Sequence, residues 1–320
     1  MRTLLSSLAL LIVVALLFFY LRPSADPAPT SQETVETEVD ESVEASPAPL
    51  PIKNVQTSNQ PIPSAAAPAG NPSVSMNVAG KRISIPARPK GSMPEGEASN
   101  VRKFTVEDGV AVIDGDIVLG VPSTNATSGF AQIPSMRLWP TREIPYHIQP
   151  SVPDPGRVLD ALAYFSQTYV NFVPYTNQED VLVFQAGTGT CKSYVGQTGG
   201  KQPIWISPGC GAHEIAHEVM HALGFAHEQN RIDRDRYIKI LEQNIEPSKL
   251  TNFEKLPQEF MQASGGADFS FDSIMIYPPD MFSSNGRPTM TPLVNGEIIS
   301  PSEKLSEQDI SRVNRIYGTR

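Results

Sequence analysis

Three histidines and one glutamate lie close together at the spacing of a catalytic metal site. They lie in the segment HEVMHALGFAH, which begins at His217. Two histidines four residues apart on a helix share one face and are about 6 Å apart along its axis, so His217 and His221 can bind one ion. Gly224 allows a sharp turn after the helix, which brings His227 round as a third ligand. Three imidazole ligands with an open fourth position are typical of catalytic Zn²⁺.

The glutamate supplies the remaining chemical group. Glu218 follows the first histidine directly, so its carboxylate can reach a water bound to the metal. A carboxylate in that position acts as a general base, because the metal makes the water more acidic. The segment therefore predicts a zinc hydrolase with Glu218 as its base.

The helix offers two registers for this motif. A second HExxH begins at His213, but its glycine position is then Met220 and its third histidine position is Leu223. The register that starts four residues later satisfies both positions. We therefore expect His213 to lie beside the site or on the surface. A helix with solvated histidines, the alternative, leaves the ligand spacing and the glycine unexplained.

The residues around this motif resemble a known family. The segment HEVMHALGFAHEQNRIDRDRY resembles the zinc signature of the astacin family of metzincin peptidases, and Ser273–Tyr277 (SIMIY) resembles its Met-turn. The resemblance covers about residues 135–320. It implies an α+β, metzincin (zincin-like) catalytic domain of two subdomains, with a twisted β-sheet, an active-site helix and a Met-turn. It also implies that Tyr277 is a further zinc ligand that swings away to stabilise the transition state.

Two more features follow from the same resemblance. Residues 191–196 (CKSYVG) resemble the family's edge strand, which pairs with an extended substrate, although Lys192 replaces the usual tryptophan. The resemblance implies a disulfide between Cys191 and Cys210. Two free thiols are the alternative, and they do not suit an oxidising compartment. We interpret residues 231–235 as a structural network of charges.

An inhibitory segment is expected upstream. Residues 113–117 (IDGDI) resemble the propeptide motif of astacin zymogens, in which the last aspartate, here Asp116, binds the zinc and displaces the water. The alternative is an ordinary hairpin turn. The inhibitory interpretation requires an activating protease that cuts between Asp116 and Trp139, where residues 124–131 look most loop-like. The resemblance further implies that the freed N-terminus contacts Glu228.

The rest of the chain divides by composition. An apolar run at residues 4–21 makes residues 1–22 a signal peptide or a membrane anchor, which places the catalytic domain outside the cytoplasm, either secreted or anchored. Residues 23–100 are rich in proline and acidic residues and have no aromatic side chain, which predicts a disordered linker. A propeptide at 101–130 and a peptidase domain at 131–320 follow. The net charge of -9 argues against nucleic-acid binding.

The elements that must position these residues can be predicted from periodicity. Apolar spacing predicts helices and alternation predicts strands. The expected elements are helices at 157–170, 212–225 and 305–317, strands at 139–148 and 181–184, β-like structure at 191–206, and a strand pair at 110–119 around a turn at 114–116.

Together these observations predict a zinc-dependent endopeptidase that is latent until processed. Its partners are a protein or peptide substrate, an activating protease and, through residues 4–21, a membrane. One alternative is a membrane-tethered binding module that kept the fold and lost the activity. Another is a zinc hydrolase that acts on something other than peptides, although an edge strand suits main-chain recognition.

Overall fold

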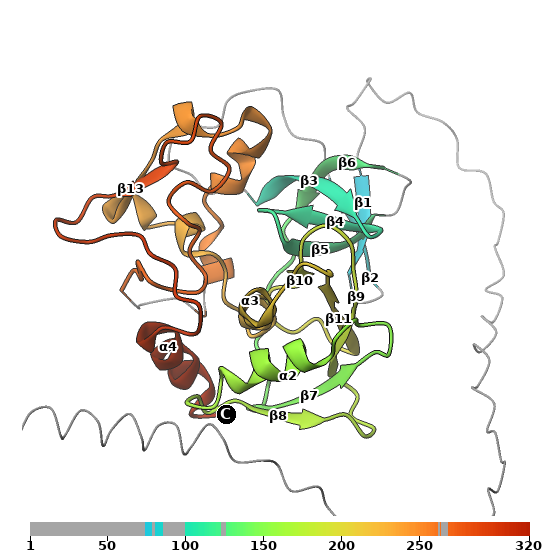
Figure 1. Ribbon diagram of the computed structural model, residues 1–320. Coiled ribbons are helices and arrows are strands. Elements are labelled where there is room, and N and C mark those ends of the chain that lie inside the picture. The colour runs from blue at the N-terminus through green and yellow to red at the C-terminus, as the bar shows by residue number, and fades with distance from the viewer. Residues whose placement is uncertain (1–73, 79–80, 86–99, 123–125, 262, 264–267) are drawn as a thin grey trace, which may run out of the picture. The chain divides into compact units, whose positions relative to one another are not determined.

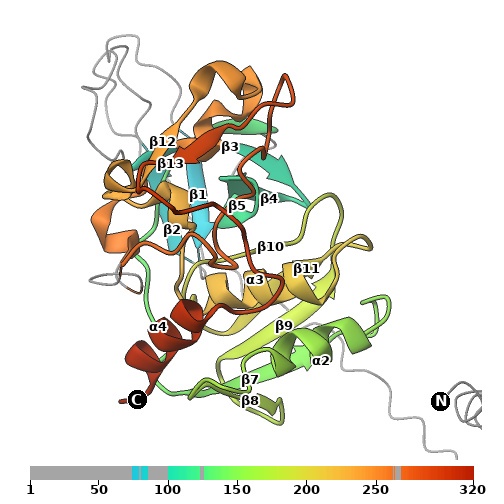
Figure 2. The ribbon, with the colours of Figure 1, turned by 60° about the vertical axis from the view of Figure 1, so that its left-hand side comes forward.

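The computed structural model describes residues 74–78, 81–85, 100–122, 126–261, 263 and 268–320 (Figures 1 and 2). The chain divides into two compact units, Met1–Ala65 and Ala66–Arg320, and only the second contains described residues. The predicted signal or anchor at 1–22 and most of the predicted linker at 23–100 therefore lie outside them. Among the described residues, none of the helices has both the length and the apolar character that a bilayer crossing requires.

One mixed sheet organises the described part of the chain. Its main path runs β6-β3-β4-β5-β10-β11-β9-β7-β8, with a hairpin of β1 and β2 attached to β5. The strands are β1 (Val74–Val78), β2 (Lys81–Ile85), β3 (Val101–Glu107), β4 (Val110–Ile113), β5 (Ile117–Pro122), β6 (Ser128–Gln132), β7 (Glu143–Ile148), β8 (Asn171–Pro174), β9 (Val181–Ala186), β10 (Lys192–Ser193) and β11 (Lys201–Ile206).

The upstream strands form an antiparallel meander. β3 pairs with β4 and β6, and β4 pairs with β5 around the predicted turn, where Asp114 and Gly115 both have positive φ. This meander, residues 101–132, contains the predicted propeptide (101–130) and is called the pro-segment below. β5 continues the sheet into the next part of the chain through a parallel bridge between Ile117 and Ser193 of β10. The β1–β2 hairpin falls inside the predicted linker, but β1 is paired with β5 rather than folded alone.

Two helices pack against the strands that follow the pro-segment. β9 runs parallel to both β7 and β11, and all of Val181–Phe184 is buried, as expected for a parallel strand covered on both faces. Helices α2 (Gly156–Ala163) and α3 (Ala212–Ala222) pack into one apolar core with these strands. In both ribbon views α3 lies near the centre of the described residues.

Local chemistry fixes the two ends of α3. At its start, the Glu214 carboxylate accepts a hydrogen bond from the Gly211 N–H at 2.8 Å, which satisfies one of the free donors of the first turn. At its end, Gly224 has φ +103°, and a Cβ there would lie 2.5 Å from Leu138 Cδ2. Only glycine suits both the conformation and the space, so the chain turns sharply at this point.

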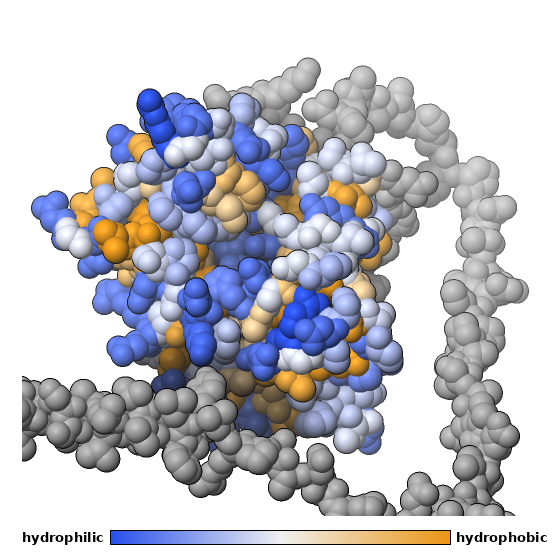
Figure 3. All heavy atoms as spheres, viewed as in Figure 1, coloured by the Kyte–Doolittle hydropathy of each residue, from blue (hydrophilic) through white to orange (hydrophobic). Residues whose placement is uncertain are grey.

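The C-terminal half is irregular. It contains the short 3₁₀ helices η1 (Glu228–Asn230), η2 (Arg234–Arg236), η3 (Glu242–Asn244), η4 (Pro247–Phe253) and η5 (Gln258–Met261), the strands β12 (Ile238–Ile240) and β13 (Met290–Pro292), and the helix α4 (Glu307–Tyr317). Ser306 caps α4, because its hydroxyl accepts a hydrogen bond from the Asp309 N–H at 3.2 Å. On the face in Figure 3, hydrophobic residues gather over the loop after β13, where Leu293 and Ile298 are exposed.

Three expected boundaries were wrong. The helix expected at 157–170 ends at Ala163, because Tyr164 and Phe165 continue as i→i+3 turns that carry Phe165 into the core before β8 begins. The strand expected from Trp139 begins only at Glu143, since the buried Trp139 donates its indole N–H to the Ala222 carbonyl instead. The loop expected at 124–131 contains the start of β6, which pairs with β3.

The predicted disulfide is confirmed. Cys191 and Cys210 are bonded, with their Cα atoms 6.4 Å apart. The bridge ties the chain just before β10 to the chain just before α3. The starts of β10 and α3 are therefore held together covalently.

Candidate metal centre

The three histidines of the second register meet at one point. His217 and His221 project from α3 and His227 comes from the chain after Gly224. The Nε2 atom of His217 lies 3.1 Å from Nε2 of His221 and 3.1 Å from Nε2 of His227. A carboxylate oxygen of Asp116 joins them, and the four ligand atoms all lie within 4.8 Å of one another.

Backbone carbonyls orient two of these rings. Nδ1 of His217 donates to the Ile274 carbonyl at 2.8 Å, and Nδ1 of His221 donates to the Phe225 carbonyl at 2.7 Å. Donation places the ring proton on Nδ1, so the lone pair of each Nε2 faces the shared point. Burial lowers the pKa of His221 to about 4 and also lowers the pKa of His227. Both rings are therefore neutral near pH 7, which is the form that binds metals.

Asp116 reaches this point from the turn between β4 and β5. Its carboxylate oxygens lie 3.6, 3.5 and 3.3 Å from Nε2 of His217, His221 and His227. Burial opposes its charge, but the neighbouring histidines, His227 first, hold the pKa of Asp116 well below its usual range. For His217, burial is likewise outweighed by the nearby Asp116 carboxylate, which raises the pKa of this histidine.

The donor set fits a zinc ion. Asp116 Oδ1 is a buried polar atom without a hydrogen-bond partner among the described residues. An orphaned buried atom of this kind calls for an explanation, and an ion is a common one. Imidazole nitrogens and carboxylate oxygens are the ligand types that zinc takes at four-coordinate sites.

Glu218 lies on α3 beside the first histidine, as expected. Its side chain is buried, and its Oε2 atom also lacks a partner among the described residues. Burial and the negative charge of Asp116 raise the pKa of Glu218 well above its usual value. A carboxyl group in such surroundings is suited to accept and hold a proton.

Tyr277 lies next to the histidines, but its hydroxyl is engaged elsewhere. Its ring centroid is 4.8 Å from that of His227, and its hydroxyl donates to the Asp114 carbonyl of the pro-segment. Burial raises the pKa of this phenol well above its usual value, so it remains a donor. The expected Met-turn lies directly before it, with Met275 buried and its carbonyl accepting from the Glu228 N–H at 2.9 Å.

The alternative HExxH motif, which begins at His213, does not form a metal site among the described residues. His213 is partly exposed on the first turn of α3 and does not belong to the group of converging ligands. The structure therefore brings together all the residues predicted from the second register and leaves His213 apart from them.

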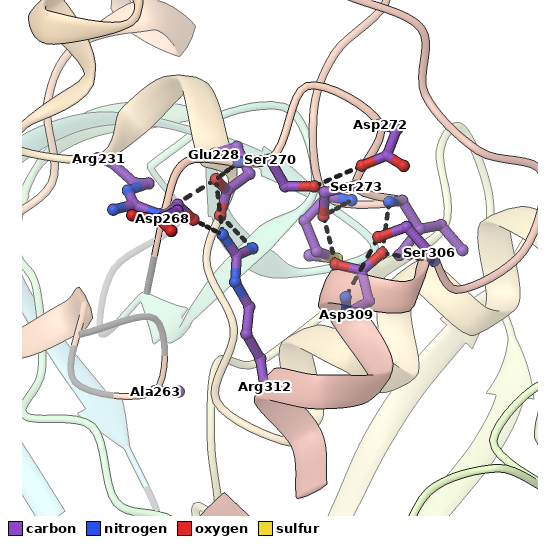
Figure 4. Close-up of polar contacts among 12 residues, drawn as sticks. Glu228, Arg231, Ala263, Asp268, Ser270, Asp272, Ser273, Ser306, Asp309 and Arg312 are labelled. Atoms are coloured by element: carbon purple, nitrogen blue, oxygen red, sulfur yellow. Dashed lines mark hydrogen bonds and ion pairs between the residues drawn. The ribbon is translucent and has the colours of Figure 1, made fainter. Parts of the chain in front are cut away.

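Glu228 is the centre of a buried charge network (Figure 4). Its carboxylate lies 2.8 Å from Nη1 of Arg312 on α4 and 3.2 Å from Nη1 of Arg231, and it accepts from the Ser270 N–H at 3.0 Å. Arg231 also pairs with Asp233, in keeping with the structural network expected at 231–235. The expected contact of a freed N-terminus with Glu228 stays a prediction.

Two polar contacts of the pro-segment were missed by the sequence analysis. Arg102 of β3 is buried and its guanidinium pairs with the Glu254 carboxylate and donates to the Glu254 carbonyl at 2.9 Å. The alternation of β3 gives a signal for its burial, because Arg102 shares the inward face with Phe104. The second contact is an ion pair in which Asp108 Oδ2 lies 2.7 Å from Lys192 Nζ. These two residues are far apart in the sequence, so no local sequence pattern could have predicted their pairing.

Fold and site together define a metallopeptidase-type domain, and comparison with known proteins names its family. Residues 131–318 match the family model of the astacin peptidases. The chain therefore belongs to the astacin family. This confirms the resemblance and the fold class predicted from the sequence, and zinc is the metal that the names of its relatives state.

Two relatives in sequence and one solved structure illustrate this similarity. "Zinc metalloproteinase nas-14" of Caenorhabditis elegans is 36% identical over 232 residues, which cover 70% of this chain and 45% of that protein. "Zinc metalloproteinase nas-7" of the same organism is 38% identical over 186 residues, covering 57% and 48%. The chain thus spans about half the length of these two relatives. The structure of the medaka (Oryzias latipes) hatching enzyme "High choriolytic enzyme 1", a zinc-protease, aligns with a TM-score of 0.51 at 33% identity, over 58% of this chain and 94% of that one.

Proposed function

We propose that this chain is a zinc-dependent endopeptidase that is made in a latent form, with Asp116 blocking its metal centre. One observation carries the proposal: three imidazole nitrogens on and after α3 converge on the carboxylate of a residue about 100 positions upstream. His217, His221 and His227 hold the metal in both forms. Asp116 occupies the position that the attacking water needs, so its removal opens the site.

Glu218 moves the proton in this proposal. When bound, zinc acts as a Lewis acid and lowers the pKa of a coordinated water toward about 7. Glu218 takes a proton from the attacking water and gives it to the leaving amine. Departure of Asp116 removes one of the two causes that raise the pKa of Glu218, so its carboxylate becomes ionised more readily and can act as the base.

Tyr277 and β10 complete the machinery. The Tyr277 hydroxyl donates to the Asp114 carbonyl in the intact chain, and loss of the pro-segment frees it to donate to a developing oxyanion. The Ser193 N–H of β10 donates to the Asp116 carbonyl at 3.0 Å. The same edge is then free to pair with the main chain of a peptide substrate.

Activation requires a protease that cuts near the end of the pro-segment, so that strands β3 to β5 and the turn that carries Asp116 can leave. Because β6 begins at Ser128, the cut falls most easily just before it, around residues 126–127. The Cys191–Cys210 disulfide supports a site of action outside the cytoplasm, since such bonds persist in oxidising compartments. We further propose residues 1–22 as a secretory signal or membrane anchor, with residues 4–21 as the apolar part.

A pair of glutamates on α3 provides the test. Glu218→Ala is expected to keep its zinc and to lose about 10²–10⁴-fold in the cleavage rate of a quenched fluorescent peptide library, the usual contribution of a general base. Glu214→Ala, in the other HExxH register and at the exposed start of the same helix, should stay within about 3-fold of wild type. Full activity of zinc-loaded Glu218→Ala would reject the mechanism. Absence of cleavage by the processed wild-type chain would favour the alternative of an inactive binding module.

A further inference from the structure

A carboxylate of the pro-segment occupies a built pocket beside the metal centre. The pocket is formed by Lys192 of β10 and by Thr188 on the loop before it, and we call it the Lys192 pocket. The Asp108 carboxylate lies 2.7 Å from Lys192 Nζ, accepts from the Thr188 N–H at 2.9 Å and accepts from the Thr188 hydroxyl at 2.5 Å. The Glu107 carboxylate lies further from the ammonium, at 3.7 Å. One negative group is thus held by a charge and two directed donors.

The Lys192 pocket and the carboxylate that occupies it lie on opposite sides of the proposed activation cleavage site. Lys192 and Thr188 lie inside the family-matched region, whereas Asp108 lies in the turn between β3 and β4 of the pro-segment. The Lys192 side chain has no exposed surface in the intact chain. Its ammonium also donates to the Thr188 and Thr190 carbonyls, at 2.9 and 3.2 Å, so these carbonyls hold it in place without neutralising it.

The Lys192 pocket also lies next to the strand edge that we propose binds the substrate main chain. Lys192 directly precedes Ser193, whose N–H donates to the carbonyl of the metal-blocking Asp116. Thr190 continues the same edge, because its hydroxyl donates to the Gly115 carbonyl at 3.1 Å. The pro-segment therefore covers the metal centre and the Lys192 pocket along one stretch of chain, residues 188–193.

We propose that the Lys192 pocket is a specificity subsite that binds the side-chain carboxylate of an aspartate or glutamate in the substrate. The inference rests on the proposed function, since it concerns the same cleft after the pro-segment has left. Once Asp108 and Glu107 have left with the pro-segment, the neutral Thr188 and Thr190 carbonyls are the remaining partners of the ammonium among the described residues. A charge held beside a cleft favours a ligand of opposite sign. Asp108 then acts as an internal stand-in for the acidic side chain. An amide side chain can accept the same hydrogen bonds but cannot neutralise the ammonium.

The expected effect is a charge preference at one substrate position. Hydrogen bonds to charged groups change binding by roughly 10-fold to 100-fold when the charge is removed. We therefore expect kcat/KM for a peptide with Glu at the preferred position to exceed that of its Gln counterpart by at least about 10-fold. Because the pocket lies on the Thr188 side of Ser193, the preference should appear on one side of the scissile bond only.

The experiment uses the full chain with a site-specific protease sequence inserted before Ser128, cut after purification. Peptide pairs that differ only by Glu and Gln are scanned through the positions around the scissile bond. In Lys192→Met the Glu to Gln ratio of kcat/KM should fall to about 1, and in Lys192→Glu a Lys-containing peptide should become the better substrate. Lys201→Met, an exposed lysine on the adjacent β11, should keep the wild-type ratio.

Each result decides the matter. A Glu preference that persists in Lys192→Met, or a processed wild-type chain that cleaves peptides with no acidic preference, would overturn the subsite. If the processed chain cleaves none of the peptides, the endopeptidase proposal fails instead. The same Glu and Gln pair is then titrated by fluorescence anisotropy, where a ratio of dissociation constants of about 10 that Lys192→Met abolishes supports the pocket and equal constants overturn it.

Discussion

Two carboxylates near α3 are held in different ways. Glu228 lies between the guanidiniums of Arg231 and Arg312 and accepts a backbone N–H, so its charge is balanced by partners within the peptidase domain. Asp116 faces His217, His221 and His227, and one of its oxygens has no hydrogen-bond partner among the described residues. The first carboxylate is fixed by the domain itself, while the second belongs to the pro-segment, which we propose leaves on activation.

Because their partners differ, we expect Glu228 to contribute mainly to the stability of the fold and Asp116 mainly to the regulation of activity. A buried charge with full partners inside one domain contributes to a single rigid arrangement, and its loss leaves the partners unpaired. A buried charge whose main partner is a metal can be exchanged for water once the chain that carries it is released. Loss of Glu228 should therefore act mainly on folding, whereas loss of Asp116 should act mainly on activity.

The largest stability effect is expected at Glu228. Glu228→Gln removes the carboxylate that two buried guanidiniums share, so the free energy of unfolding should fall by about 3–5 kcal/mol. Chemical denaturation of the intact chain measures this, with the exposed Glu303→Gln as the matched control. A change of less than about 1 kcal/mol would show that the network is not a fixed structural element.

The disulfide is the covalent part of the fixed region. Replacing Cys191 and Cys210 by serine should lower the free energy of unfolding by about 3 kcal/mol, because the bridge closes a loop with a sequence separation of 19. Denaturation of the wild-type chain with and without a reducing agent gives an independent value. Equal stability of the double variant and the wild type would contradict this role.

Asp116→Ala should act in the opposite way, by raising activity. Without its carboxylate the intact, uncut chain is expected to cleave peptides about 10-fold to 100-fold faster than the uncut wild type, which corresponds to about 1.4–2.8 kcal/mol. Asp160→Ala, an exposed aspartate of α2, serves as the control and should leave the chain latent. If uncut Asp116→Ala is no more active than the uncut wild type, Asp116 is not the blocking group.

The smallest effect, and a pH-dependent one, is expected at Asp108. Burial opposes its charge, but hydrogen bonds from Lys192 and Thr188 lower its pKa below the ordinary 3.8. A depressed folded-state pKa adds stability above about pH 3.8 and loses it as the pH falls through the folded value. Asp108→Asn should therefore cost about 0.5–1 kcal/mol at pH 7 and progressively less below pH 3.8. A difference that does not shrink in acid would contradict the ion pair.

The sequence predicted the metal-binding residues better than it predicted the contacts of the pro-segment with the peptidase domain. The ligand spacing identified α3 and all three histidines, because helical periodicity fixes which residues share a face. The helix at 157–170 was predicted too long, since periodicity does not show that Phe165 turns into the core. The contacts of Arg102 and Asp108 were missed, because they join residues far apart in the chain and depend on how the pro-segment docks.

Metal content in two single variants tests the central claim most directly. We predict about one zinc per chain in the wild type and in His213→Ala, measured by elemental analysis after dialysis. His217→Ala should bind far less zinc, because it removes one of three protein ligands. Zinc retained in His217→Ala and lost in His213→Ala would contradict the assignment of the site.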